Sequence, residues 1–248
     1  MKLLLIRHGE TVDNVASIWA GVRDSALTSH GALQASHLGA ALSARSPPLS
    51  PAHVFSSDLQ RAAKTAQACV SSFDPQPPHT KLVVLRERDF GPLEGKSFRG
   101  EGATTDAEAV AEPREAMRAR ADAFITEHLI PALKTHAKDG TCILVVSHGI
   151  MLATLFTALT MRAPRGGVTY TPSALSTEGF VPGVLPWWGN TAYLECEVRV
   201  EEGDKLRLEV DKINEMGHLA NVRKAGGGIG NATYDEKQTK MDMFLKKA

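Results

Sequence analysis

Two histidines occupy similar sequence contexts, in which a histidine could take part in a functional site. His8 lies in the run IRHG and His148 in the run VSHG, each after a short apolar segment and directly before a glycine. Residues 3–6 and 142–146 are predicted to be buried strands, and ligands of open α/β sheets bind at the carboxyl ends of strands. A single histidine at a strand end is usually structural. The repeated context, with Arg7 preceding His8, favours a shared functional site.

The elements that must position these histidines alternate between short apolar strands and helices. Thr28 is a good N-cap for the first long helix, and Pro131 adjusts the helix that spans 115–138. This alternation predicts an α/β three-layer sandwich, with a mostly parallel central sheet and helices on both faces, as one domain over 1–248. The predicted strands are 3–6, 53–56, 82–85 and 142–146, and the predicted helices are 28–46, 59–70, 115–138 and 150–161.

Residues 162–190 interrupt the pattern with prolines, glycines and aromatic side chains. We expect 163–188 to be a lid insertion that contacts the substrate, with Trp187 and Trp188 as its main aromatic residues. The alternative is a surface loop whose tryptophans pack on the domain. Residues 191–200 and 206–213 then alternate around a turn and predict a hairpin, and a tail of open role begins at about 214.

Composition and charge exclude several classes of protein. The 248 residues carry 28 basic and 28 acidic side chains, so no net positive field favours nucleic acid or anionic membranes. Cys69, Cys142 and Cys196 are too scattered for a disulfide framework or a zinc site, which indicates a reducing compartment. The apolar run at the N-terminus is too short for a signal peptide and none reaches the length of a membrane span, so we expect a cytoplasmic protein. The sequence does not indicate the oligomeric state.

The ordered set of motifs resembles the histidine phosphatase superfamily, which has the phosphoglycerate mutase-like fold. Residues 5–11 look like its signature at the first strand, and residues 147–149 like its second histidine motif. Further matches follow in the family's order over residues 3–193: Asn14; Leu27, Thr28, Gly31, Gln34 and Ala35; Ser56, Ser57, Leu59, Arg61, Ala62, Thr65 and Ala66; Glu87, Phe90, Gly91, Leu93 and Gly95; Asn190 and Thr191.

The resemblance implies a metal-independent phosphomonoesterase without a cofactor, acting on a small phosphorylated metabolite. It makes His8 the nucleophile that forms a phosphohistidine and Glu87 the group that transfers protons. It places Arg7, Asn14, Arg61 and His148 around the phosphate, where fixed cationic donors can hold three charged oxygens. Asn190 and Thr191 join Trp187 and Trp188 in the predicted substrate lid. Taken singly, Arg61 could be a solvated helix residue, and Glu87 could pair with Arg86 or Arg88.

Two other functions remain open within this fold. A phosphoglycerate mutase-type phosphoryl transfer is the first, but the run RERDFG at 86–91 departs from the Glu, Arg, His, Tyr, Gly run of glycolytic mutases and favours a phosphatase. A noncatalytic phosphate-binding or interaction module is the second, although all five central site residues are intact. Residues 103–112 also depart from the family pattern. Sugar phosphates, sugar bisphosphates, phosphorylated acids and phosphotyrosine therefore all remain open as substrates.

Overall fold

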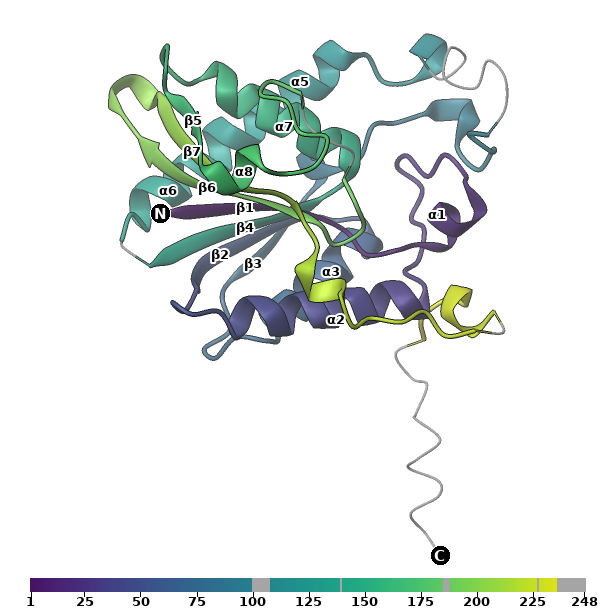
Figure 1. The fold of residues 1–248 in the computed structure, drawn as a ribbon. Helices are drawn as coiled ribbons and strands as arrows, with labels where there is room; N and C mark the ends of the chain where they lie inside the picture. Colours follow the sequence, from purple (N-terminus) through teal and green to yellow (C-terminus); the bar gives the residue numbers. More distant parts are fainter. Residues whose placement is uncertain (100–107, 139, 185–187, 227, 236–248) are drawn as a thin grey trace, which may run out of the picture.

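A seven-stranded mixed sheet forms the centre of the protein, in the order β3-β2-β4-β1-β6-β7-β5 (Figure 1). The computed structural model describes residues 1–99, 108–138, 140–184, 188–226 and 228–235. Four of the six neighbouring pairs are parallel (β1–β4, β2–β4, β2–β3 and β5–β7), and β6 is antiparallel to both of its neighbours. The strands are β1 (Lys2–Arg7), β2 (Ser50–Ser57), β3 (His79–Leu82), β4 (Thr141–Ser147), β5 (Val168–Tyr170), β6 (Tyr193–Val200) and β7 (Leu206–Glu215).

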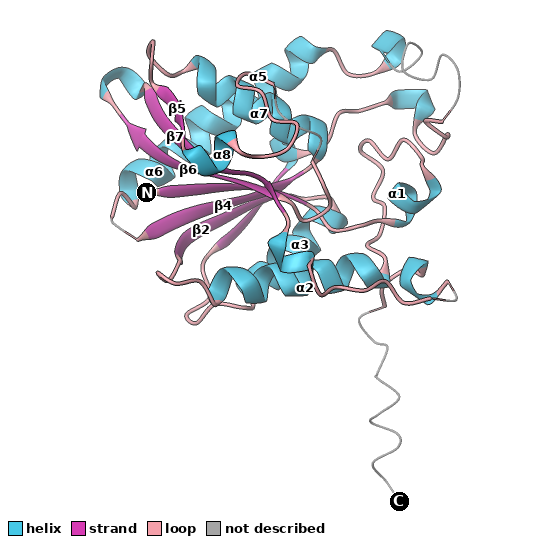
Figure 2. Ribbon diagram, viewed as in Figure 1, coloured by secondary structure: helices cyan, strands magenta, loops and turns pink. Residues whose placement is uncertain are grey.

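Helices cover both faces of this sheet, as Figure 2 shows. Helices α2 and α3 lie on one face, and α5, α6 and α7 lie on the other. A single π-helical segment, Ile125–Leu129, joins α5 to α6 just before Pro131, so the predicted adjustment of that long helix is present. The helices are α1 (Val12–Ala16), α2 (Ser29–Ser43), α3 (Gln60–Val70), α5 (Arg114–Phe124), α6 (Ile130–Thr135), α7 (Gly149–Met161) and α8 (Pro172–Leu175), with short 3₁₀ turns at Val83–Leu85, Gly91–Leu93, Glu202–Asp204, Gly217–Leu219 and Ile229–Asn231.

The alternating side chains of β1 explain why helices cover both faces of the sheet. Leu3 and Leu5 pack into the core under α5 to α7, whereas Leu4 and Ile6 pack into the core against α2 and α3. All four are fully buried, as expected for a strand whose alternate residues face two hydrophobic layers. The predicted three-layer α/β sandwich is confirmed. Within the described chain, no helix is both long enough and apolar enough to cross a membrane.

The predicted strand at 82–85 is wrong in its position. The edge strand is His79–Leu82, which pairs with Val54–Ser57, and the chain then enters a 3₁₀ turn at Val83–Leu85. Leu85 is fully buried, and its carbonyl accepts a hydrogen bond of 2.7 Å from the Ser147 hydroxyl at the end of β4. The apolar run therefore anchors a turn instead of extending the strand, and this turn delivers Glu87 to the carboxyl edge of the sheet.

The segment 163–188 has two parts in the described chain. Its first part adds β5 to the edge of the sheet beside β7, followed by α8. Trp188 ends the segment and is buried in the core beneath α7, whereas Trp187 lies outside the described residues. After β7, residues 217–226 and 228–235 run along α2, and a bridge joins Thr233 to Thr28, the N-cap of α2.

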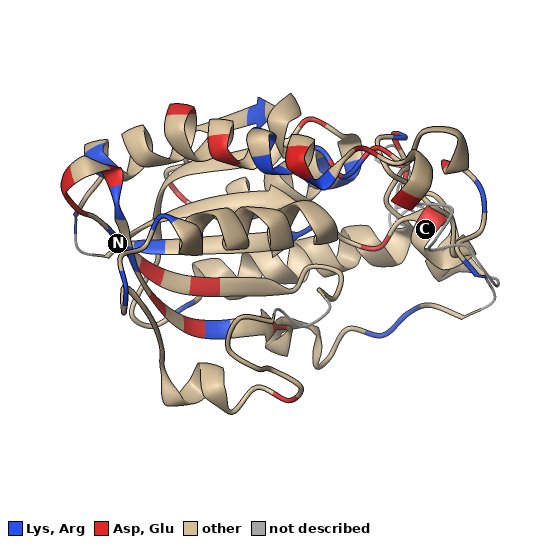
Figure 3. Cartoon of the chain, turned by 90° about the horizontal axis from the view of Figure 1, so that it is seen from above, with Lys and Arg blue, Asp and Glu red and all other residues tan. Residues whose placement is uncertain are grey.

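Most charged residues of the described chain lie outside the buried core. In Figure 3, basic and acidic residues are interspersed along α5, whereas α7 carries neither. An exception is Glu195 on β6, which is fully buried and forms ion pairs with Lys2 and Arg45. Its pKa is lowered because these two hydrogen-bonding cations outweigh the cost of burial.

Candidate active site

Strands β1 and β4 lie side by side and end together, which brings the two histidines into one site. Arg7 stands opposite Ser147 in the parallel register, and the His8 amide donates to the Ser147 carbonyl at 3.0 Å. The imidazole centroids of His8 and His148 are 5.1 Å apart. Both side chains are buried. The matching strand ends therefore place the two rings next to each other, with their planes tilted by 59°, at the edge where α/β sheets bind ligands.

The His8 ring is held in one orientation by its own loop. Nδ1 lies 2.7 Å from the Gly9 carbonyl oxygen, so Nδ1 carries the proton and donates to it. Burial, together with the charges of Arg61 and Arg7, lowers the pKa of His8 well below 6.5. The ring is therefore neutral at physiological pH. Its second nitrogen, Nε2, has a free lone pair to offer a ligand.

His148 is arranged in the complementary way. The Nε group of Arg61 donates to His148 Nδ1 at 3.1 Å, which places the ring proton on Nε2. Burial and the nearby charges of Arg61, His8 and Arg7 lower the pKa of His148 as well. Nε2 finds no acceptor among the described protein atoms. One histidine thus presents an acceptor nitrogen and the other a donor N–H.

Arg61 is fully buried near the start of α3 and is clamped by a distant loop. Its two terminal nitrogens donate to the carbonyls of Gly21 and Arg23, both at 2.6 Å. Burial lowers its pKa to about 10, so the guanidinium remains charged at pH 7. A solvated helix position is excluded for this side chain.

The loop that clamps Arg61 is itself fixed by Glu94. The Glu94 carboxylate accepts hydrogen bonds from the amides of Val22 at 2.7 Å and Arg23 at 3.0 Å. It also accepts one from the Phe90 amide at 3.2 Å. Gly21 has a φ of +49°, and a Cβ there would lie 1.9 Å from the Glu94 carboxylate. The loop that holds Arg61 therefore requires a glycine at position 21 to accommodate the Glu94 carboxylate.

Arg7 is the second cationic side chain of the site. It donates through Nη1 to the Trp188 backbone carbonyl, which ties the end of the 163–188 segment to the site. Burial lowers the pKa of Arg7, and the negative charge of Glu87 opposes that change. Trp188 therefore contributes its carbonyl to the site, while its ring joins the core under α7.

Glu87 lies at the amino end of α7. Its Oε1 accepts from the Arg88 and Met151 amides at 2.9 and 3.0 Å, and Oε2 accepts from the Ile150 amide at 3.1 Å. Helix amino ends attract negative charge, and α7 begins directly after His148. Neither neighbouring arginine pairs with this carboxylate, because Arg86 binds Asp58 and Arg88 binds Glu108.

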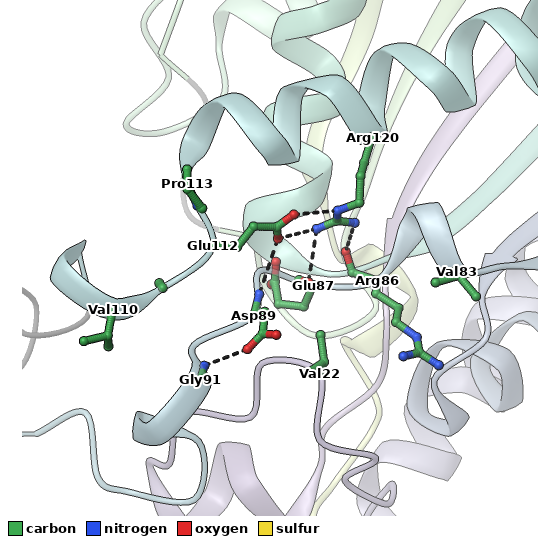
Figure 4. A pocket seen from close by; sticks show the side chains of 11 residues that line it. Val22, Val83, Arg86, Glu87, Asp89, Gly91, Val110, Glu112, Pro113 and Arg120 are labelled. Carbon is green, nitrogen blue, oxygen red and sulfur yellow. Dashed lines mark hydrogen bonds and ion pairs between the residues drawn. The ribbon is translucent and has the colours of Figure 1, made fainter.

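The backbone that carries Glu87 is held by Arg120 from α5 (Figure 4). Arg120 donates to the carbonyls of Val84 and Arg86 at 2.9 Å and of Glu87 at 3.3 Å, and it forms an ion pair with Glu112 at 2.6 Å. A cavity of about 520 Å³ adjoins this group on the far side of Glu87. Arg120 was not foreseen from the sequence, although it shares a helix face with the buried Met117 and Phe124, an unusual place for an arginine.

The two asparagines meet behind His8. Asn190 Nδ2 donates to the His8 carbonyl and to Asn14 Oδ1, both at 3.2 Å. Asn14 also belongs to the capping box of α1, since its side chain accepts from the Thr11 amide. Thr191 adopts a φ of +57°, its amide donates to the His8 carbonyl, and its hydroxyl lies 2.9 Å from His218 Nε2. Asn190 and Thr191 thus contact the loop that carries His8.

A cavity of about 580 Å³ opens over these residues, within the size range of small-molecule sites. Arg7, His8, Arg61 and Glu87 line its polar end together with Asn14 and Asn190. The rest of the lining is largely apolar and aromatic and includes Ile18, Trp19, Phe90, Phe98, Ile150, Ala153 and Trp188. Of these residues, the sequence predicts only Trp188 to contact the substrate.

Comparison with known proteins agrees with this geometry. The family model of the histidine phosphatase superfamily (branch 1) matches residues 3–172. A "probable phosphatase" of Schizosaccharomyces pombe is 33% identical over 250 residues, which cover 98% of this chain and 79% of that protein. A 2,3-bisphosphoglycerate-dependent phosphoglycerate mutase of Xanthobacter autotrophicus is 31% identical, with 66% of this chain and 83% of that protein covered.

Among solved structures, the alpha-ribazole phosphatase of Shigella flexneri superposes with a TM-score of 0.60 and 26% identity. The superposition covers 87% of this chain and 97% of that one. The region that the family model matches, residues 3–172, contains β1, α3 and β4. It also contains Arg7, His8, Arg61, Glu87 and His148. The chain belongs to the histidine phosphatase superfamily.

Proposed function

We propose that the protein is a metal-independent phosphomonoesterase that works through a phosphohistidine on His8. The observation that carries this proposal is the fixed tautomer of His8: its Nδ1 is bound to the Gly9 carbonyl, so Nε2 is the nucleophilic nitrogen. A neutral imidazole is the reactive form, and burial beside Arg7 and Arg61 keeps the ring neutral. The similarity to phosphatases supports the same reaction class.

The reaction has two displacements at phosphorus. Nε2 of His8 forms a bond to phosphorus while the ester P–O bond breaks, and the leaving oxygen takes a proton from the carboxyl group of Glu87. Water then attacks the phosphohistidine and gives a proton to the Glu87 carboxylate, while the P–N bond breaks and inorganic phosphate leaves. Arg7, Arg61 and the Nε2–H of His148 hold the three phosphoryl oxygens in both steps.

A mutase is the second candidate, favoured by the similarity to phosphoglycerate mutases. A mutase must keep its phosphohistidine from water and return the phosphoryl group to a reoriented product. Its substrate also carries a carboxylate that needs a partner. Among the described residues, the lining beyond the phosphate end of the cavity is largely apolar and includes no cationic partner for a carboxylate, which supports hydrolysis over transfer between phosphoglycerates.

Rapid-quench labelling tests the proposal. Wild-type protein mixed with ³²P-labelled phenyl phosphate should yield acid-labile, base-stable label on the protein, and His8→Ala should yield neither label nor turnover. EDTA should leave turnover unchanged, and vanadate, which adopts the five-coordinate shape of the transition state, should inhibit. Turnover by His8→Ala at the wild-type rate, or loss of activity in EDTA that magnesium restores, would overturn the mechanism.

A further inference from the structure

We infer that the site selects phosphate monoesters whose organic part is aromatic or otherwise apolar and carries no second anionic group. This inference rests on the proposed phosphatase function and adds the substrate class. It follows from the division of the cavity into one charged end and one apolar wall.

The apolar wall is built by two loops that lie far apart in the sequence. Ile18 forms a bridge with Ser97, the Trp19 amide donates to the Lys96 carbonyl at 2.9 Å, and the Phe98 amide donates to the Ser17 carbonyl at 3.0 Å. This pairing sets the two segments side by side. The wall is therefore fixed by backbone hydrogen bonds and is available before a substrate binds.

Three aromatic rings meet on this wall. The Trp19 ring stacks at a tilt on Phe90, with centroids 4.3 Å apart, and meets the edge of Phe98 at 5.6 Å. Phe98 is 41% exposed and Ile150, across the cavity, is 36% exposed. Large apolar side chains held open to solvent at the mouth of a cavity indicate a surface that binds apolar groups.

The cationic residues that line the described part of the cavity lie at its phosphate end. Of the described residues that line it, Arg7 and Arg61 are the cationic ones, and both contact the space above His8. A phosphoryl group would occupy both guanidinium groups, so a carboxylate or second phosphate on the substrate would face aromatic rings.

Among the described residues that line the cavity, Glu10 is a further charged residue, and it is already paired. Glu10 lines the cavity, and Lys224 lies 2.8 Å from both of its carboxylate oxygens. The Thr28 hydroxyl donates to the same carboxylate at 2.9 Å. Lys224 is thereby committed to Glu10, so neither of these two described residues offers a positive charge to a second anion.

Three esters of primary alcohols separate organic-group recognition from leaving-group chemistry: 2-phenylethyl phosphate, glycerol 3-phosphate and 3-phosphoglycerate. We expect kcat/KM to be about tenfold or more higher for 2-phenylethyl phosphate than for glycerol 3-phosphate, because the ring leaves water, and lowest for 3-phosphoglycerate. Equal values for the first two, or a preference for 3-phosphoglycerate, would overturn the inference. Failure of the wild type to hydrolyse any ester would instead refute the phosphatase proposal itself.

Two substitutions at Phe98 test the wall directly. Phe98→Ala should lower kcat/KM for 2-phenylethyl phosphate about threefold to tenfold with little change for glycerol 3-phosphate, and Phe98→Arg should raise kcat/KM for 3-phosphoglycerate by supplying a cation. Tyr234→Ala is the matched control, since Tyr234 is 39% exposed and lies outside this cavity. If Phe98→Ala slowed all three esters equally, Phe98 would not recognise the organic part and the inference would fail.

Discussion

Removal of the Glu94 carboxylate should damage both stability and phosphate binding, although Glu94 does not reach the phosphate. The carboxylate accepts three backbone N–H groups, from Val22, Arg23 and Phe90. The loop it holds supplies the two carbonyls that orient Arg61. Glu94→Ala therefore releases the support of a buried arginine.

The size of the effect follows from the exposure of each bond. A hydrogen bond to a charged acceptor contributes roughly 1.5 to 3 kcal/mol where water is excluded. The bond from Arg23 is exposed, so water replaces it, whereas those from Val22 and Phe90 are partly buried. We expect Glu94→Ala to lower the free energy of unfolding by about 2 to 3 kcal/mol. Glu94→Gln can keep both Oε1 bonds and should lose about 1 kcal/mol or less.

The functional effect depends on the position of Arg61. A displacement of about 1 Å in a positioning group can cost up to about 10²-fold in rate, so kcat/KM should fall about 10- to 100-fold in Glu94→Ala and less than about threefold in Glu94→Gln. Urea denaturation and 4-nitrophenyl phosphate hydrolysis measure the two quantities. Glu201→Ala, which removes an exposed ion pair with Arg207, serves as the control and should change neither. A destabilised but fully folded Glu94→Ala protein with wild-type kcat/KM would refute the link between Glu94 and Arg61.

Two further predictions concern Glu87 and His148. Glu87→Gln should slow 2-phenylethyl phosphate by about 10²- to 10⁴-fold but 4-nitrophenyl phosphate far less, because only the poorer leaving group needs a proton. Steady-state rates measure this, and equal slowing would mean that Glu87 only shapes the site. The lowered pKa of His148 should make the protein less stable as pH falls through about 6.5, since the unfolded chain binds a proton there that the folded chain does not. Urea midpoints between pH 7.5 and 5.5 should therefore fall less steeply for His148→Gln than for the wild type, and parallel slopes would contradict the assignment.

The parts of the fold that were predictable are those coded by local patterns. The apolar runs at β1 and β4 identify buried strands because both of their faces meet hydrophobic layers. Thr28 caps α2 through a 2.9 Å bond from the Gly31 amide, as its residue type suggested. The strand predicted at 82–85 was wrong because a short apolar run is compatible with either a strand or a 3₁₀ turn. The pairing of β3 with β2 ends at Leu82, and residues 83–85 form the turn.

The candidate site was predictable at its phosphate end and unpredictable elsewhere. Arg7, His8 and His148 follow strands, so the sheet itself places them, and Arg61 follows from the family motif. The support of Arg61 by Gly21 and Glu94 depends on contacts between positions about 40 to 70 residues apart that carry no periodic signal. The aromatic wall depends in the same way on an isolated bridge between Ile18 and Ser97. Such contacts are set by tertiary structure alone.

The buried arginines meet two chemical requirements with the same charges. They provide positive potential of the kind that a phosphate dianion needs, and that potential adds to burial in lowering the pKa of His8, which keeps the proposed nucleophile unprotonated. Arg61 further donates to Nδ1 of His148, which leaves the ring proton of His148 on Nε2. A lysine at position 61 would keep the charge, but its single nitrogen could not reach two carbonyls and an imidazole in the fixed planar geometry of a guanidinium. The arrangement therefore requires arginine for the shape of its donors as much as for its charge.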